Sequence, residues 1–361
     1  MGKAGDASAD LSASSPGLRG FRGCGDAIEV DMRVFRKIRS AAFSAAPACL
    51  AAAVLLAAVL PLVRCGGSSR EASPSASGTA GTVDVVATLF PLYDFARQVG
   101  GDEVSVSLLL PPGVEAHSFD PSPGDVLKVS RARVFLYIGE AMEPWVGGFL
   151  RGVKNPRLIA VETSRGLELL HGHGGDHDHG EDGEAQGADP HVWLDPVNAA
   201  AMVDTVAAAL GEAAPEKREL FRANAAAYKE KLRDLDERIV RAVKTFRIKT
   251  IPYGGHFAFS YFAKRYGLSH ISPYPGFAPN AEPTPRRIVA LAAKMKELGL
   301  QVIYHEELTE PRVARAVARE TGARLLLLHG AHNVGKDDLA RGLTYLDIME
   351  RNLENLEAGL R

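Results

Sequence analysis

Short apolar runs alternate with longer amphipathic stretches along the chain from Thr82 onward. A first series comprises VDVVATL (83–89), VSVSLLL (104–110), RVFLYIG (133–139) and RLIAV (157–161). A second series comprises IKTIPYG (248–254), LSHIS (268–272), LQVIYHE (300–306) and ARLLLLH (323–329). Strands separated by helical segments are typical of α/β layering with parallel sheets. The pattern therefore predicts two α/β units.

Between these runs, helices are expected where apolar residues recur at helical spacing. Pro91 opens one helix, which runs to Val99 and stops at Gly100-Gly101. Others are expected from Val197 and over 257–266, 285–298 and 311–321. The last segment, TYLDIMERNLENLEAGL, places a set of apolar side chains on one helix face: Leu346, Met349, Leu353, Leu356 and Leu360.

One long helix separates the two series. Residues 215–246 keep an apolar stripe throughout, formed by Phe221, Tyr228, Leu232, Leu235, Ile239 and Val243. At a rise of 1.5 Å per residue this helix is about 45 Å long, which suits a connection between two lobes. We therefore expect an N-terminal lobe over 82–214, a linking helix over 215–246 and a C-terminal lobe over 247–361.

The N-terminal region has the organisation of an export signal. From Met32, which we expect to be the true start, a basic segment leads into an Ala/Leu/Val run that ends at Val63. Cys65 follows with a Gly/Ser tail, as at a bacterial lipoprotein processing site, although Arg64 stands where such sites carry a small residue. The alternative is an uncleaved signal anchor. Both alternatives tether the exported body to a membrane.

The predicted organisation therefore has an N-terminal extension and signal over 1–65. Residues 66–81 are rich in Ser, Gly, Ala and Pro and are expected to form a flexible tether.

Composition narrows the chemistry of the body. The 361 residues are 46% hydrophobic and 24% charged with a formal net charge of −2, so the chain lacks the basic excess of a nucleic-acid-binding protein. All three cysteines lie at or before Cys65. A metal in the body must therefore be bound by His, Asp, Glu or backbone oxygen.

Four histidines stand where ligands collect in α/β proteins, beyond the carboxyl ends of strands or in stiff loops. They are His117, His191, His256 and His329, each in a loop marked by Pro or Gly. A single histidine at a strand end is usually an ordinary loop residue, but four such residues, two in each lobe, indicate a metal site between the lobes. Imidazole suits Zn, Cu, Fe and Ni, and four imidazoles complete a tetrahedral shell typical of zinc.

Six segments also resemble a known family. They are FPLYDFARQVGGDEVSVSLLLPPGVEAHSFDPSP, GEAMEPW, DPHVWLDP, GGHFAFSYFAKRYGL, AEPTPRRI and YLDIMERNLENL. In this order they resemble the zinc/manganese solute-binding proteins of bacterial ABC importers. The resemblance implies two Rossmann-like α/β lobes joined by a long rigid helix, with a metal site in the cleft between them.

The resemblance also implies metal ligands. His117, His191 and His256 match the family's ligand motifs. The family usually has an aspartate as the fourth ligand, and His329 stands at the aligned position here. His332, a water molecule or a carboxylate such as Glu282 are the alternatives.

A His-rich tract, HGHGGDHDHGEDGE (171–184), has the composition of a metal-binding segment, but its glycines leave the ligands without a fixed geometry. Zinc-binding members of the family often carry such a loop at this position. We therefore expect it to be an exposed accessory site, with a solvated linker as the alternative. Its candidate ligands are His171, His173, His177 and His179.

The resemblance implies a monomeric extracytoplasmic receptor, not an enzyme, that captures Zn²⁺ with high affinity and delivers it to an ABC permease. Manganese or another divalent metal is the alternative cargo. Manganese-selective members of the family resemble a ligand set of two histidines and two carboxylates, so three or four imidazoles favour zinc. A zinc hydrolase would need an open coordination position, and the sequence contains no HExxH pattern. A surface adhesin is the remaining alternative.

Overall fold

The computed structural model describes residues 81–171, 187–274 and 283–361. The predicted signal, Cys65 and most of the tether lie outside the described residues, as do His173, His177, His179 and Glu282. Among the helices that are described, none is long and apolar enough to cross a membrane.

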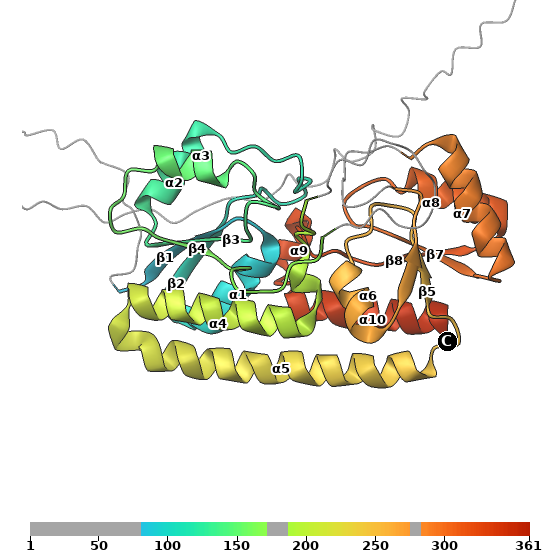
Figure 1. Cartoon of the computed structure of the whole chain (residues 1–361). Helices are drawn as coiled ribbons and strands as arrows, with labels where there is room; N and C mark the ends of the chain where they lie inside the picture. Colours follow the sequence, from blue (N-terminus) through green and yellow to red (C-terminus); the bar gives the residue numbers. More distant parts are fainter. Residues whose placement is uncertain (1–80, 172–186, 275–282) are drawn as a thin grey trace, which may run out of the picture. The chain divides into compact units, whose positions relative to one another are not determined.

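The first lobe is built on a parallel sheet with the strand order β2-β1-β3-β4 (Figure 1). Its strands are β1 (Val83–Ala87), β2 (Val104–Leu108), β3 (Val134–Tyr137) and β4 (Ile159–Glu162). Its helices are α1 (Phe90–Gly100), α2 (Pro123–Arg131), α3 (Val146–Gly152) and α4 (Pro196–Ala213). Two of these helices, α2 and α3, were not among the predicted elements.

The second lobe contains two parallel strand pairs, β5–β6 and β7–β8, joined by a parallel bridge between Tyr253 and Tyr304. Its strands are β5 (Thr250–Pro252), β6 (Ser269–Ile271), β7 (Val302–His305) and β8 (Arg324–Leu327). Its helices are α6 (Ser260–Tyr266), α7 (Pro285–Glu297), α8 (Arg312–Thr321), α9 (Lys336–Ala340) and α10 (Tyr345–Leu360). All eight predicted strands are confirmed, although each hydrogen-bonded ladder is shorter than its apolar run.

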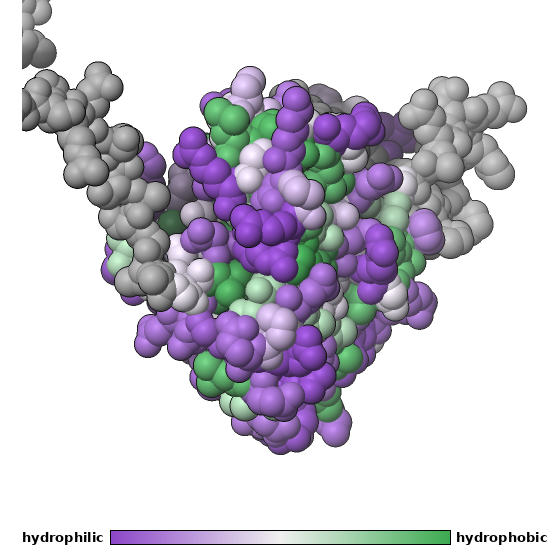
Figure 2. All heavy atoms as spheres, turned by 90° about the vertical axis from the view of Figure 1, so that its left-hand side faces the viewer, coloured by the Kyte–Doolittle hydropathy of each residue, from purple (hydrophilic) through white to green (hydrophobic). Residues whose placement is uncertain are grey.

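The long helix α5 (Arg218–Thr245) runs beneath both lobes, and α10 lies beside it (Figure 1). The predicted segment 215–246 thus forms one helix after a single 3-10 turn at Pro215–Lys217. The predicted apolar stripe of α5 is buried and belongs to one hydrophobic core that contains residues of both lobes. On the face of the first lobe shown in Figure 2, hydrophilic residues are interspersed with hydrophobic ones.

A buried carboxylate joins three of these helices. Asp94 of α1 accepts hydrogen bonds from the hydroxyl of Tyr228 in α5 (3.3 Å) and from the backbone N–H of Tyr345 in α10 (2.9 Å). The Tyr345 hydroxyl in turn donates to the backbone carbonyl of Trp193, at 2.5 Å. The first turn of α10 is therefore hydrogen-bonded to the first lobe, although the helix follows the strands of the second.

Candidate metal centre

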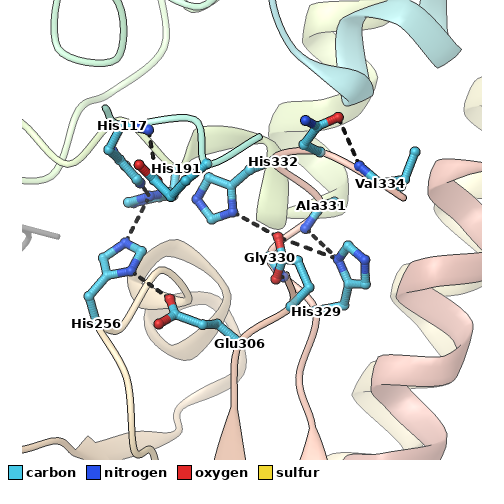
Figure 3. A network of polar contacts seen from close by, with 12 residues as sticks. His117, His191, His256, Glu306, His329, Gly330, Ala331, His332 and Val334 are labelled. Atoms are coloured by element: carbon cyan, nitrogen blue, oxygen red, sulfur yellow. Dashed lines mark hydrogen bonds and ion pairs between the residues drawn. The ribbon is translucent and has the colours of Figure 1, made fainter. Parts of the chain in front are cut away.

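Four imidazole rings meet between the two lobes. His117 comes from the β2–α2 loop, His191 from the turn before α4, His256 from the β5–α6 loop and His332 from the β8–α9 loop. Their potential ligand nitrogens all lie within 4.8 Å of one another, and Figure 3 shows the rings of His117, His191 and His256 converging with His332 beside them. Loops at the carboxyl ends of strands thus supply three of the four rings, as expected for an α/β protein.

The spacing of the nitrogens suits a metal ion. Nε2 of His191 lies 3.3 Å from Nε2 of His117 and 3.3 Å from Nε2 of His256. A tetrahedral zinc ion with Zn–N bonds of 2.0–2.1 Å places its ligands about 3.3–3.4 Å apart. Nε2 of His332 is buried and has no hydrogen-bond partner within the described part of the chain. A cation at the centre would satisfy this atom.

Three carboxylates orient the rings from behind. Nδ1 of His191 lies 2.7 Å from Asp189, Nδ1 of His256 lies 3.0 Å from Glu306, and Nδ1 of His332 lies 3.0 Å from Glu307. A carboxylate accepts only, so each neutral ring carries its proton on Nδ1 and leaves the Nε2 lone pair free. Carboxylates placed in this way fix the tautomer and direction of metal-binding histidines.

The loop of His117 is fixed through its backbone instead. The Glu115 side chain accepts the backbone N–H groups of His117 at 2.8 Å and Ser118 at 2.7 Å. A cavity of about 30 Å³ adjoins the centre and is lined in part by His117, His256 and His332. This space suits a single ion, because pockets for organic ligands are about tenfold larger.

The surroundings of His117 and His191 lower the pKa values of both rings. Burial, together with the neighbouring imidazoles, holds the pKa values of His117 and His191 well below their usual range. Both rings therefore stay neutral, which is the form that binds metal. Burial opposes the charged form of His332, but its hydrogen bond to Glu307 and the nearby carboxylates together outweigh burial and raise its pKa.

The structure does not bring His329, the predicted fourth ligand, into the cluster; His332, the alternative left open by the sequence, takes that place. Asn352 accepts the backbone N–H of His329 at 2.7 Å, and Nδ1 of His329 accepts the backbone N–H of Ala331 at 3.0 Å. The left-handed backbone of Ala331 (φ 56°) then turns the loop, so that the two rings lie on either side of Glu307, whose Oε1 is 3.6 Å from Nδ1 of His329 and 3.0 Å from Nδ1 of His332 (Figure 3).

Sequence reasoning missed Glu306 and Glu307 as partners of the histidines. A signal for them is present, because the pair directly follows β7, as His117, His256 and His332 follow other strands. Glu307 also accepts the backbone N–H of Gly330 at 2.7 Å, so it binds two groups of the loop that carries His332. Consecutive residues thus hold rings from two different loops.

The residues on either side of the His-rich tract lie next to Asp189, whose side chain contacts His191 of the metal centre. His171 is exposed and forms an antiparallel bridge with Ala188, and the backbone N–H of Asp189 donates to Leu170 at 2.7 Å. The Tyr261 hydroxyl accepts the N–H of Leu170 at 2.9 Å and donates to the carbonyl of Asp189 at 2.7 Å. The two ends of the tract are therefore joined beside Asp189, the partner of His191.

Comparison with known proteins places the chain in a family. Residues 85–359 match the family described as "Zinc-uptake complex component A periplasmic". The high-affinity zinc uptake system protein ZnuA of Bacillus subtilis is 34% identical over 310 residues, covering 85% of this chain and 96% of that protein. The zinc-binding protein AdcA of Streptococcus pyogenes is 35% identical over 288 residues, and the matched part covers 76% of this chain and 56% of AdcA.

A solved structure gives the same result. The Zn(II)-bound ZnuA-like domain of Streptococcus pneumoniae AdcA superposes with a TM-score of 0.65 and 32% sequence identity, covering 78% of this chain and 99% of that domain. The match extends over both lobes and every loop that carries an imidazole of the cluster. This chain belongs to the zinc-uptake component A family of metal solute-binding proteins.

Proposed function

We propose that the protein is an extracytoplasmic receptor that captures Zn²⁺ between its lobes and delivers it to the permease of an ABC importer. The observation that carries this proposal is the cluster of four imidazoles, His117, His191, His256 and His332. Three of them have a carboxylate on Nδ1. The names of the relatives ZnuA and AdcA, as zinc uptake and zinc-binding proteins, support the same cargo.

The ligand set favours zinc over manganese. Manganese binds best to carboxylate, carbonyl and water oxygens, whereas imidazole suits zinc. Among the described residues, the carboxylates hydrogen-bonded to the four histidines contact them at Nδ1 or at the backbone N–H. Four nitrogen ligands close a tetrahedral shell and leave no coordination position for an activated water, so the arrangement suits binding and release better than hydrolysis.

Anchoring at the membrane surface completes the proposal. Cys65 follows the hydrophobic run of the signal, and a relative from Streptococcus pneumoniae is named as a zinc-binding lipoprotein. Lipidation at this cysteine would hold the body beside its permease while residues 66–81 span the distance between them. The chain covers about half the length of the AdcA relatives. The permease is therefore proposed as a partner only from the part of AdcA that this chain shares.

The test is a competitive titration of the chelator-treated body, from Thr82 to the C-terminus, with Zn²⁺ and Mn²⁺. We expect one tight zinc site and much weaker manganese binding. Replacing His332 by Ala should weaken zinc binding at least 100-fold, because a buried ligand is lost and the shell opens. Replacing His329 by Ala should change zinc affinity less than threefold, because this ring lies outside the cluster.

A variant in which residues 172–186 are replaced by a short Gly-Ser turn separates the centre from the His-rich tract. Tight binding by this variant supports the centre between the lobes and leaves the tract an accessory role. Loss of tight binding in this variant, with His332→Ala unaffected, would place the site in the tract and overturn the proposal.

A further inference from the structure

The segment that carries His332 leaves a strand of the second lobe but is hydrogen-bonded to the first. The backbone carbonyl of His332 accepts the N–H of Phe90 at the start of α1, at 3.2 Å. The carbonyl of Gly330 accepts the indole N–H of Trp193 at 2.8 Å. His332 therefore has its backbone anchored on the first lobe and its ring held by Glu307 of the second.

Asn333 makes the most extensive of these connections. Its side chain is fully buried, and its Nδ2 group donates to the carbonyls of Pro111 at 2.7 Å and Val114 at 2.9 Å. Its Oδ1 accepts the backbone N–H of Val334 at 2.9 Å. Both amide hydrogens are thus used on one turn of the first lobe, and that turn belongs to the loop that presents His117.

A third bond closes the same connection. The N–H of Gly113 donates to the carbonyl of Val334 at 2.9 Å, and Gly113 has the positive φ of 85° that favours glycine. Three hydrogen bonds therefore join the Pro111–Val114 turn to Asn333 and Val334. His117 follows this turn by three residues and His332 directly precedes Asn333, while their ring centroids lie 5.1 Å apart.

We propose that Asn333 is a positioning residue for metal capture, which fixes His117 and His332 relative to each other across the boundary between the lobes. This inference rests on the proposed function, because it assigns a residue to the same metal centre. Its chemical basis is the paired donor: an amide can donate to two carbonyls at once, whereas a leucine donates to neither.

The four ligands of the metal centre are therefore not equivalent. His117 and His332 are joined through Asn333, and His191 belongs to the same lobe as the Pro111–Val114 turn. The loop of His256 is instead hydrogen-bonded within the second lobe, where the N–H of Gly254 donates to Tyr304 at 2.8 Å and the carbonyl of Gly255 accepts from Ser272 at 2.8 Å, and Glu306 of that lobe contacts the His256 ring. Three ligands thus form one preorganised set, to which the fourth is added.

The experiment compares Asn333→Leu with Asn352→Leu in the zinc-binding body. Asn352 is an equally buried asparagine whose side chain binds the backbone N–H and carbonyl of His329, which lies outside the cluster. Both substitutions remove buried hydrogen bonds and should lower stability. Only Asn333→Leu should weaken zinc binding, by about 10- to 100-fold, the effect typical of residues that orient metal ligands. Asn333→Asp, which keeps the shape, replaces the leucine variant if that variant does not fold.

Two further measurements separate positioning from general destabilisation. In the His332→Ala background, Asn333→Leu should cost less than threefold in affinity, because the relative position of the two rings no longer matters. The Co²⁺-loaded protein should lose the intense visible absorption of four-coordinate cobalt in Asn333→Leu and keep it in Asn352→Leu.

The outcomes also distinguish this inference from the proposed function. Equal zinc affinities in wild type, Asn333→Leu and Asn333→Asp would overturn the role of Asn333 and leave the metal centre standing. Equal losses in the Asn333 and Asn352 variants would assign Asn333 a structural role only. Weak zinc binding by the wild-type body itself would overturn the proposed function.

Discussion

Glu143 is a buried acid outside the metal centre. Its carboxylate accepts hydrogen bonds from the Thr88 hydroxyl at 2.5 Å and from the backbone N–H groups of Ile138 at 3.2 Å and Gly139 at 3.0 Å. Burial nevertheless outweighs these donors and raises the pKa of Glu143 from its ordinary value of 4.5 to about 7. The folded protein therefore holds a proton there at pH values at which the unfolded chain has lost it.

This difference predicts a pH dependence of stability. A raised folded-state pKa favours folding below pH 4.5, and this contribution is lost as the pH rises through about 7. The loss amounts to about 3 kcal/mol at 1.36 kcal/mol per pKa unit. In urea unfolding of the zinc-free protein, the free energy of unfolding of wild type relative to Glu143→Gln should fall by this order between pH 4.5 and 7.5. A difference that stays constant over this range would show that folding leaves the pKa of Glu143 unchanged.

At the residue scale, motifs and strand ends were sufficient to indicate His117, His191 and His256 as members of one cluster. They predicted His329 as the fourth ligand, with His332 as an alternative, whereas the structure brings His332 into the cluster. That choice depends on the left-handed backbone of Ala331 and on Asn352, which holds the backbone of His329. Glu307 then holds the ring of His332 from another loop. Hydrophobic periodicity records which residues are buried, not the path of a loop after its strand ends.

At the element scale, the two glycines after β5 have different neighbours. A Cβ at Gly254 would lie 2.5 Å from Cβ and 2.7 Å from Cα of Ala314 in α8, so the segment that follows β5 passes directly against the backbone of this helix. A Cβ at Gly255 would lie 2.9 Å from Oε1 of Glu306, the carboxylate that orients His256. Glycine at position 254 therefore permits a close approach of the two backbones.

Replacing each glycine by alanine should therefore give different defects. Gly254→Ala meets backbone atoms that cannot move aside, so it should destabilise the fold by about 1–3 kcal/mol. Gly255→Ala meets the end of a side chain, so it should affect stability less but displace Glu306 and weaken zinc binding by about tenfold. Thermal unfolding and zinc titration of both variants measure the two effects. The prediction fails if Gly255→Ala lowers the stability but leaves zinc affinity unchanged. It also fails if Gly254→Ala weakens zinc binding but leaves the stability unchanged.

Element positions were predictable because strands and helices leave periodic patterns. All eight strands and the long helix follow from the sequence, since each strand coincides with a short apolar run and the helix with a long apolar stripe. The attachment of the segment around Asn333 to the first lobe does not follow. It depends on single hydrogen bonds between loops more than 200 residues apart in the sequence. Such bonds have no periodicity, so the sequence could assign this segment only to the strands that precede it.

At the scale of the whole molecule, the largest hydrophobic core contains residues of both lobes, and each lobe has a smaller core of its own. The largest cluster of buried residues includes Val85 of β1, Ile239 of α5, Tyr304 of β7 and Leu356 of α10. The buried bonds of Asp94 to α5 and α10 lie within the same region. We therefore expect the lobes to unfold together, since the unfolding of one lobe would also remove the packing of α5 and α10 against the other.

Zinc should strengthen this coupling, because both lobes contribute ligands. In the zinc-free protein, the backbone amides of β1 and β7 should lose their protection from hydrogen exchange at the same urea concentration. Free zinc at about 1,000 times the dissociation constant should raise the free energy of unfolding by about 4 kcal/mol, and by the same amount for both strands. His256→Ala should reduce this increase for both strands alike. Loss of protection in two steps, with zinc shifting only the step of β1, would mean that the first lobe binds zinc alone and that the lobes are independent.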